Sequence, residues 1–438
     1  MTDRLAALYP AHLQSLKERH DRALAETGFD HAVIFAGAQH MIFLDDMPYP
    51  FKANPHFKAW LPVVDNPYCF VVYTPGKKPR LVFYQPVDYW NKVADTPAGY
   101  WVEHFDIRTI GSAEDARQHF PGDGRAAFIG EWSSEYPGEP NPQPLLDRLH
   151  YARTWKTDYE IECMRQANEL GARGHRAAEK AFRTGASEYE IHLQYLRAAD
   201  HTEEELPYGN IIALNENASV LHYMKHDRRR LDGNLFSFLI DAGASVNGYA
   251  ADITRTYSRR DDEFARLIQA VDAMQQEICA AVKPKVNYPD LHVLAHHKIG
   301  EILIRFDFVR GIDADGIVQK HISSAFFPHG LGHYIGLQVH DVAGFMADAG
   351  GHTIPKPEGH PFLRITRPVE PKMVFTIEPG LYFIDPLLSE LRKGENAKYV
   401  NWTKVDAFRK FGGIRIEDDV VVTERGIRNL TREAFGKV

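Results

Sequence analysis

Five residues in the second half of the chain belong to the types that bind metal ions in enzymes: Asp241, Asp252, His333, Glu378 and Glu417. Four carboxylates and one imidazole make an oxygen-rich set of donors, which suits a pair of Mn, Co, Fe or Zn ions better than one structural zinc ion. Each residue taken alone is also compatible with an ordinary structural role. Their occurrence together indicates a metal-dependent hydrolase.

Asp241 and Asp252 flank a turn signal, and so they are predicted to lie on the two strands of a β-hairpin. A two-residue loop at Val246 and Asn247 would place the two carboxylates directly opposite each other. A loop at Asn247 and Gly248 would make them diagonal neighbours on one face. Facing carboxylates repel each other unless a cation lies between them, and two metal ions roughly 3.5–4 Å apart could share their oxygens.

Glu378 and Glu417 lie at or near the ends of predicted strands. Glu378 follows the apolar run 373–377 and is followed by Pro379, which ends the strand. Glu417 alternates with isoleucines and therefore shares one strand face with Arg415. Glu378 suits either a turn residue or a ligand held by rigid backbone, whereas Glu417 by itself suits an ordinary half-buried strand.

A glycine-rich segment at 327–341 contains three histidines, His329, His333 and His340. His329 and His333 are four residues apart, but the glycines between and after them make a metal-binding helix unfavourable. The glycines suggest instead that the backbone closely approaches a bound molecule. One imidazole as a metal ligand and two as proton donors or orienting groups would be chemically reasonable.

The composition is that of a globular protein of two or three domains, with 438 residues, 44% hydrophobic and 25% charged. A net charge of −8 offers no general basic field for nucleic acid or for a membrane, and the basic cluster 226–230 is interpreted as a solvated loop. No apolar stretch approaches the roughly 20 residues that cross a bilayer. The 3 cysteines lie far apart, which fits a reducing cytoplasm better than a disulfide framework.

The periodicity of the sequence changes near residue 155. Before it, short β-rich runs alternate with helical stretches, which predicts a small α/β domain, and the segment 43–60 is so rich in aromatic residues and proline that it predicts an ordered contact loop. After it, helices precede strands, which predicts an α+β domain with an antiparallel sheet. The predicted strands are 31–37, 68–74, 80–84, 126–131, 235–242, 249–257, 373–383 and 413–422, and the predicted helices are 3–25, 157–182, 187–199, 262–282 and 288–305.

Several motifs along the whole chain resemble the pita-bread metallopeptidases and, among them, the bacterial Xaa-Pro dipeptidases or prolidases. These motifs are the loop 44–52, Arg153–Thr157, Pro207–Ile211 and Gly412–Asp418. The resemblance implies a creatinase-like N-terminal domain at 1–155, a pita-bread metallopeptidase domain at 156–438, and a homodimer.

The resemblance also implies that the five residues named first bind two divalent metal ions, most readily Mn²⁺, with Co²⁺ or Zn²⁺ as alternatives. None of the five is replaced, which argues against the metal-free relatives of the family. Three residues would be catalytic. Glu378 would pass a proton to the leaving proline nitrogen, His340 would stabilise the oxyanion, and His329 would line the site.

Five further residues are implied to bind the substrate. His222 and Tyr208 would line the site, and Arg364 or Arg415 would receive the substrate carboxylate, which an arginine fork suits. Asp45, on the loop that reaches over from the partner subunit in relatives, would hold the substrate ammonium and block longer peptides.

The expected activity is hydrolysis of Xaa-Pro dipeptides by a hydroxide bound to two metal ions, which releases the N-terminal amino acid and proline. Such a bond needs a dedicated site because the proline nitrogen carries no hydrogen. One alternative is aminopeptidase P, which acts on longer Xaa-Pro peptides; another is a non-catalytic pita-bread binding protein. Organophosphorus esters and fluorides are expected at most as side substrates, and neither nucleic acid nor membrane as a partner.

Overall fold

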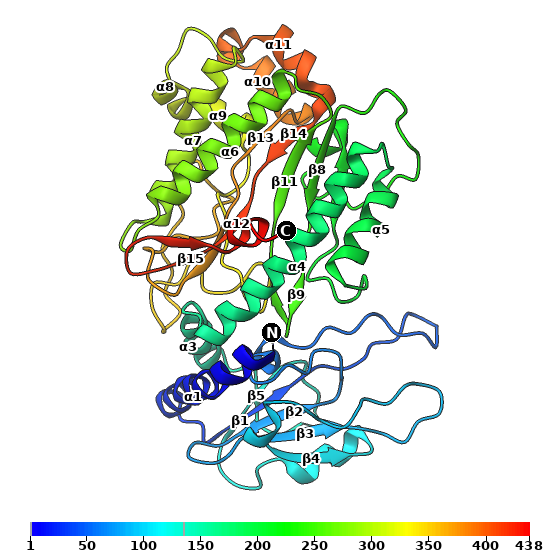
Figure 1. Ribbon diagram of the computed structural model, residues 1–438. Helices are drawn as coiled ribbons and strands as arrows, with labels where there is room; N and C mark the ends of the chain where they lie inside the picture. Colours follow the sequence, from blue (N-terminus) through cyan, green and yellow to red (C-terminus); the bar gives the residue numbers. More distant parts are fainter. Residues whose placement is uncertain (1, 135) are drawn as a thin grey trace. The chain divides into compact units, whose positions relative to one another are not determined.

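The computed structural model describes residues 2–134 and 136–438, which form two compact units (Figure 1). No helix in these ranges is long and apolar enough to cross a lipid bilayer. The first unit contains the residues up to Cys163 together with Asn247–Tyr249 and Asp348–His352, and the second contains Met164–Val246, Ala250–Ala347 and Thr353–Val438.

The first unit is built on a mixed six-stranded sheet with the order β4-β3-β2-β1-β5-β6. The four strands predicted in this part of the chain are confirmed. Two strands, β4 and β6, were not predicted. Their residues are polar and mostly not buried, so these strands are defined by pairing with a neighbouring strand and lack the apolar pattern of a buried strand. The strands are β1 (His31–Phe35), β2 (Phe70–Tyr73), β3 (Arg80–Tyr84), β4 (Asp106–Ile110), β5 (Ala126–Ile129) and β6 (Glu139–Pro140).

The helices of the first unit begin with α1 (Thr2–Thr27), which confirms the helix predicted at 3–25. α2 (Pro55–Lys58) is a single turn whose N-cap, Asn54, accepts a hydrogen bond from the amide of His56. α3 (Gln143–Arg153) packs against α1. The predicted boundary between residues 155 and 156 falls in the connection from α3 to the next helix.

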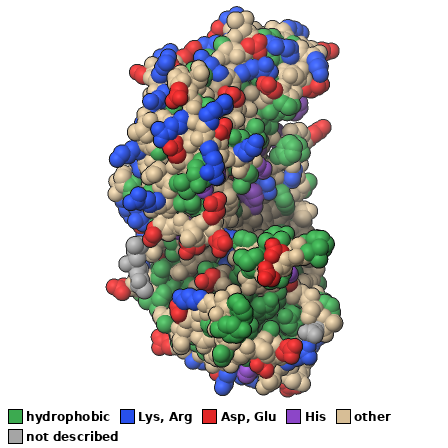
Figure 2. All heavy atoms as spheres, turned by 90° about the vertical axis from the view of Figure 1, so that its right-hand side faces the viewer, with side chains coloured by type: hydrophobic (Ala, Val, Ile, Leu, Met, Phe, Trp, Pro, Cys, Tyr) green, Lys and Arg blue, Asp and Glu red, His purple; other side chains and the backbone are tan. Residues whose placement is uncertain are grey.

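Two loops of the first unit expose large apolar side chains. Phe43 and Leu44 are 85% and 90% exposed, and in the second loop Tyr89 and Trp90 are 87% and 80% exposed. Figure 2 shows hydrophobic side chains gathered on this unit. Exposed apolar patches of this kind usually mark a surface that another molecule covers.

The second unit has long helices where the sequence predicts them. α5 (Glu188–Ala199) begins with the predicted capping box, in which Ser187 and Glu190 each accept a hydrogen bond from the backbone amide of the other. The other helices are α4 (Asp158–Arg183), which starts in the first unit, α6 (Glu263–Ala281), α7 (Tyr288–Arg305), α8 (Ala314–Gln319), α9 (Ile322–Phe326), α10 (Asp385–Lys393), α11 (Trp402–Phe408) and α12 (Leu430–Phe435).

The strands of the second unit pair antiparallel, as predicted. In Figure 1, β8, β11, β13 and β14 run between α6 and α7 on one side and α4 and α5 on the other. β8 lies between β7 and β11, and β15 lies between β12 and β16. The strands are β7 (Ile211–Leu214), β8 (Ser237–Asp241), β9 (Ser245–Val246), β10 (Tyr249–Ala250), β11 (Thr254–Ser258), β12 (Val374–Ile377), β13 (Gly380–Tyr382), β14 (Gly413–Arg415), β15 (Asp418–Val422) and β16 (Ile427–Asn429).

Candidate active site

The four candidate carboxylates lie where strands end or break. Asp241 is the last residue of β8. The three long strands predicted at 249–257, 373–383 and 413–422 are each interrupted, and Asp252, Glu378 and Glu417 occupy the interruptions. An interrupted strand frees its side chains from regular alternation. These breaks therefore allow side chains from separate strands to converge on one point.

The hairpin register decides how Asp241 and Asp252 face each other. Asn247 and Gly248 have φ values of 53° and 83°, as a two-residue type I′ turn requires, and Asp241 pairs with Thr254. The two aspartates are therefore diagonal neighbours, as the loop at Asn247 and Gly248 predicts. The hydroxyl of Tyr208 lies 2.8 Å from Oδ1 of Asp241 and 2.5 Å from Oδ1 of Asp252. One hydroxyl hydrogen cannot serve both carboxylates, and the nearest positive groups are Arg415 beside Asp241 and His333 beside Asp252.

His333 faces two of the carboxylates. Its Nε2 lies 3.5 Å from Oδ2 of Asp252 and 3.5 Å from Oε1 of Glu378. Its Nδ1 lies 3.0 Å from the carbonyl oxygen of Tyr334, which can only accept a hydrogen bond. Nδ1 must therefore carry a hydrogen, which makes Nε2, the nitrogen that faces the two carboxylates, the one that a metal ion would bind after displacing its proton.

Glu417 completes the cluster from the break between β14 and β15, 163 positions after Thr254. Its backbone amide donates to the carbonyl of Thr254 at 3.0 Å, and the Thr254 hydroxyl donates to Oε2 at 2.6 Å. Ligand atoms of Asp252, His333 and Glu417 all lie within 4.8 Å of one another, and all three residues are buried. The assignment of these residues as metal ligands stays a prediction.

The electrostatics of the cluster fit a metal centre. Burial raises the pKa of Glu378 to about 7 and raises the pKa values of Asp241 and Glu417 above their usual range. Burial would also raise the pKa of Asp252, but the contact with His333 outweighs burial and lowers that pKa. Burial would lower the pKa of His333, but its contacts with Asp252 and Glu378 outweigh burial and raise that pKa to about 9. Crowded, desolvated carboxylates of this kind are stabilised by divalent cations.

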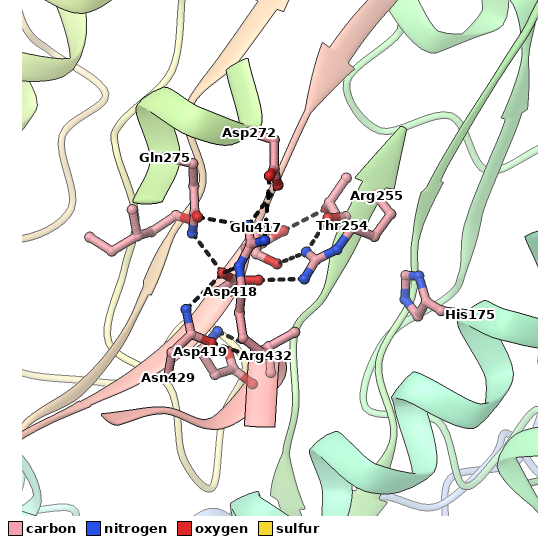
Figure 3. Close-up of polar contacts among 12 residues, drawn as sticks. His175, Thr254, Arg255, Asp272, Gln275, Glu417, Asp418, Asp419, Asn429 and Arg432 are labelled. Carbon is pink, nitrogen blue, oxygen red and sulfur yellow. Dashed lines mark hydrogen bonds and ion pairs between the residues drawn. The ribbon is translucent and has the colours of Figure 1, made fainter. Parts of the chain in front are cut away.

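The residue that follows Glu417, Asp418, is the centre of a network of ion pairs and hydrogen bonds in which two arginines balance its charge (Figure 3). Asp418 is fully buried, and it accepts hydrogen bonds from Arg255 at 2.6 Å, from Arg432 at 2.7 Å and from Gln275 at 2.9 Å. Burial alone would raise the pKa of Asp418, but the two arginines outweigh it and lower that pKa. This acid therefore has its counter-charges within the protein and holds the strand that carries Glu417.

Asp419 anchors a second member of the cluster. Its Oδ2 accepts hydrogen bonds from the backbone amide of Asp252 at 3.1 Å and from the side chain of Asn168 at 2.8 Å. Burial and the charge of Asp252 raise the pKa of Asp419 well above its usual range. Asp419 was not predicted from the sequence, although two consecutive acids in an otherwise apolar strand were a usable signal.

The two other histidines differ in how firmly they are held. His329 contacts the Tyr382 hydroxyl through Nε2 at 2.9 Å and the Gly330 carbonyl through Nδ1 at 2.8 Å, and burial lowers its pKa to about 3. The ring of His340 lies edge-on against His333 with the centroids 4.4 Å apart, and burial lowers its pKa to about 4. Both imidazoles are therefore neutral at physiological pH.

The two candidate arginines have different surroundings. Arg415 is 4% exposed, and it donates to Asp241 at 2.6 Å, to Tyr382 at 2.9 Å and to Thr254 at 3.2 Å. Each of its three side-chain nitrogens is thus engaged within the protein. Arg364 is exposed, and its charge helps to lower the pKa of His340.

Comparison with known proteins identifies the family. Residues 7–151 match the sequence model of the Xaa-Pro dipeptidase N-terminal domain, and residues 162–424 match that of metallopeptidase family M24. The chain is 51% identical to the Xaa-Pro dipeptidase of Shewanella oneidensis, over 98% of this chain and 99% of that protein. It is 52% identical to the Xaa-Pro dipeptidase of Stenotrophomonas maltophilia, over 98% and 97%. The chain belongs to the Xaa-Pro dipeptidases of family M24.

Solved structures confirm the predicted fold of this M24 peptidase, a creatinase-like N-terminal domain followed by a pita-bread domain. Pseudomonas aeruginosa aminopeptidase PepP superposes with a TM-score of 0.73 at 23% identity, over 95% of this chain and 94% of that one. Zinc-substituted E. coli aminopeptidase P superposes with a TM-score of 0.72 at 23% identity, over 96% and 95%. At this identity the likeness concerns the fold alone.

The remaining predicted substrate residues of the M24 peptidase lie outside this tightly bonded cluster. His222 is exposed, and its charge acts on both His329 and His340. Asp45 belongs to the first unit, where its Oδ1 accepts hydrogen bonds from the backbone amides of the next two residues at 2.7 and 3.3 Å. The substrate roles of His222 and Asp45 stay predictions.

The interpretation of the glycine-rich segment was wrong at two positions. A side chain at Gly332 would lie 2.0 Å from the carbonyl oxygen of Thr376, and one at Gly330 would lie 2.8 Å from that of Phe362. These glycines allow the segment to pack against the backbone of its own chain and not against a bound molecule. The close packing places His333 beside β12, where its backbone exchanges hydrogen bonds with Thr376.

Proposed function

We propose that this M24 peptidase hydrolyses Xaa-Pro dipeptides to the N-terminal amino acid and proline. The observation that carries the proposal is the convergence of Asp241, Asp252, His333, Glu378 and Glu417 from separate strands. It occurs in a chain about half identical to Xaa-Pro dipeptidases over nearly its full length.

The same five residues would hold two divalent metal ions, Mn²⁺ before Co²⁺ or Zn²⁺. Four carboxylates and one imidazole supply mostly oxygen, and oxygen donors suit manganese. Bound there, the ions would make water nucleophilic at neutral pH and polarise the scissile carbonyl. The raised pKa values of the buried acids and the position of His333 Nε2 between Asp252 and Glu378 support this assignment.

Glu378 is the residue that moves the proton. Its carboxylate faces the cluster beside His333, where it can accept a proton from the attacking water and deliver it as a carboxylic acid. The proline nitrogen carries no hydrogen, so it must be protonated before it leaves as an amine. His340 is neutral and accessible, and it donates a hydrogen bond to the developing oxyanion.

Arg364 is the better candidate to receive the substrate carboxylate. Arg415 already donates to three protein groups, among them Asp241, so moving it to the substrate would leave a buried carboxylate without its partner. Arg364 is exposed beside His340 and keeps its fork available. In this assignment Arg415 and Tyr208 position the aspartates, and His329 and His222 line the site.

The proposal includes a homodimer in the cytoplasm. The exposed apolar loops of the first unit, which carry Phe43, Leu44 and Trp90, suit a surface that a second copy covers. Asp45 lies among these apolar residues, and its exposed carboxylate would hold the substrate ammonium of the other subunit. The 3 cysteines are buried and unpaired, which suits a reducing compartment.

The deciding experiment uses metal-free protein to which Mn²⁺ is added back. Proline release from Ala-Pro is measured beside cleavage of Ala-Pro-Ala. We expect manganese-dependent cleavage of the dipeptide alone. Cleavage of the tripeptide would show an aminopeptidase P instead. If neither peptide is cleaved, the catalytic assignment is wrong. Diisopropyl fluorophosphate, assayed in the same preparation, tests for the organophosphorus side activity, which its complete stability would exclude.

A further inference from the structure

A second group of metal-ligating side chains lies in the same unit and takes no part in the proposed reaction. His292 and His296 are one turn apart on α7, so both point from the same helix face, and His360 approaches from the loop before Leu363. The ligand nitrogens of the three rings all lie within 4.8 Å of one another. Nε2 of His292 and Nδ1 of His360 are 2.9 Å apart.

The rings are held in place by their surroundings. Nδ1 of His296 lies 3.0 Å from the Ser323 hydroxyl, which occupies one nitrogen and leaves Nε2 for the cluster. Ring centroids within the cluster are 4.6 to 4.9 Å apart, and Phe327 packs against His296 at 4.9 Å. For His296, such a fixed partner is typical of a ligand of a preformed metal site.

The three imidazoles are in the protonation state that binds metals. Burial lowers the pKa of His292 to about 2 and that of His296 to about 3, and it also lowers the pKa of His360. After burial, the largest causes that act on these pKa values are the charges of other histidines, including His321 and His329. At neutral pH each ring is uncharged, and a metal ion would replace the single hydrogen that His292 and His360 share, with the ring hydrogens on the outer nitrogens.

We propose that His292, His296 and His360 bind one divalent transition-metal ion of the zinc type. Three imidazoles with one open position are a common donor set for Zn²⁺, and nitrogen donors favour Zn²⁺, Ni²⁺ or Cu²⁺ over Mn²⁺. His292 and His296 are each 2% exposed, whereas His360 is partly exposed and leaves a path for the ion and for a water ligand. The ion joins α7 to the loop that leads to Arg364.

The test separates this site from the carboxylate cluster by removing the cluster first. In the double variant Asp252→Asn, Glu417→Gln, metal analysis after equilibration with micromolar Zn²⁺ and dialysis should find about one ion per chain. Adding His360→Phe should remove that ion and the rise in Tm that Zn²⁺ produces. The matched control is His297→Ala, because His297 lies on the same helix but is 37% exposed and pairs with Asp315 and Glu301. This control should retain the ion.

A second measurement covers the case in which the double variant does not fold. Metal-free wild-type protein is titrated with Co²⁺, and the visible absorption that grows with nitrogen coordination is compared with that of His360→Phe. The proposal predicts about one fewer ion per chain in the variant, with an altered spectrum. Equal stoichiometry in wild type and variant, or a folded double variant that holds no Zn²⁺, would show that the three rings are only a packed aromatic group. Neither readout depends on dipeptide cleavage, so the proposed function can fail separately.

Discussion

The second unit buries two groups of side chains of the types that bind metal ions. The carboxylate cluster consists of Asp241, Asp252, His333, Glu378 and Glu417, and the histidine cluster consists of His292, His296 and His360. In the first, burial drives the pKa of Glu378 up to about 7, close to the working pH. In the second, burial drives the pKa of His292 down to about 2, far from it. Desolvation opposes charge in both cases, but a carboxylate is charged at neutral pH and an imidazole need not be.

The difference shows what each cluster requires of its surroundings. Asp241 and Asp252 need Arg415, the Tyr208 hydroxyl and, in our proposal, two cations. The histidines need only hydrogen-bonding and ring contacts, such as that between His296 and Ser323. The carboxylate cluster should therefore be the region that is most sensitive to mutation and to the removal of metal.

The largest expected effect comes from removing one carboxylate of the cluster. Glu417→Gln keeps the shape of the side chain but removes a charge, and we expect kcat/KM for Ala-Pro to fall by at least about 10³-fold. The matched control is Glu424→Gln, an exposed acid a few residues further along the chain, which should have no effect. Steady-state kinetics at saturating Mn²⁺ measure both. Full activity of Glu417→Gln would exclude this glutamate from the site.

The next largest effect concerns an acid whose charge is compensated by the protein alone. Asp418→Asn leaves Arg255 and Arg432 without their buried partner, and we expect the free energy of unfolding to fall by about 3–5 kcal/mol. Urea denaturation with and without Mn²⁺ should give the same loss. Asp406→Asn, in a half-exposed pair with Arg392, should cost at most about 1 kcal/mol. A loss present only with Mn²⁺ would place Asp418 among the metal-binding groups instead.

The two arginines separate substrate binding from support of the cluster. Arg364→Met should raise KM for Ala-Pro by about 10–100-fold with little change in kcat, since a charged hydrogen bond contributes about 1.5–3 kcal/mol. Arg415→Met should instead lower kcat and the bound Mn²⁺, because it releases Asp241. The reverse pattern would assign the substrate carboxylate to Arg415.

The smallest expected effect is on the pH dependence of the free energy of unfolding of the metal-free protein, to which Glu378 and His292 should contribute with opposite signs. The pKa of Glu378 is raised to about 7 in the fold, so its stabilising contribution is present below its unfolded value of 4.5 and is lost as pH rises to 7. The pKa of His292 is lowered to about 2, so its contribution is present above 6.5 and is lost as pH falls below that value. Each slope is at most about 1.4 kcal/mol per pH unit.

These slopes are read from differences between the unfolding free energies of wild type and variant at pH 4.5 to 7. Wild type minus Glu378→Gln should decrease with rising pH, and wild type minus His292→Gln should increase. Two slopes of the same sign would contradict the contrast between the two clusters.

The elements that local sequence specifies were predicted well. The helix α7 (Tyr288–Arg305) has the predicted bounds, and α5 starts at the predicted capping box. Helical periodicity and capping depend on residues within a few positions of one another, so a single sequence contains the information. The edge strand β4 was missed because its side chains are barely buried and only its partner, β3, defines it.

The candidate site could be predicted in composition but not in arrangement. The sequence contains the five ligand types, and the turn residues Asn247 and Gly248 allowed the correct hairpin register as one of two options. It did not show that long predicted strands break at Asp252, Glu378 and Glu417. The breaks arise where strands from different sheets meet, as in the bridge between Thr254 and Glu417.

The sequence by itself determined the family, the metal-binding chemistry and the helices, because residue types and short spacings carry that information. Only the tertiary structure shows that Arg415 donates a hydrogen bond to Asp241 and that Asp419 accepts one from the backbone amide of Asp252. It alone also shows that three histidines lie close together. The physical reason is distance along the chain. The first two contacts join residues 174 and 167 positions apart, and the third brings His360 to a helix 68 positions earlier. Contacts of this kind exist only once the sheets and helices have packed.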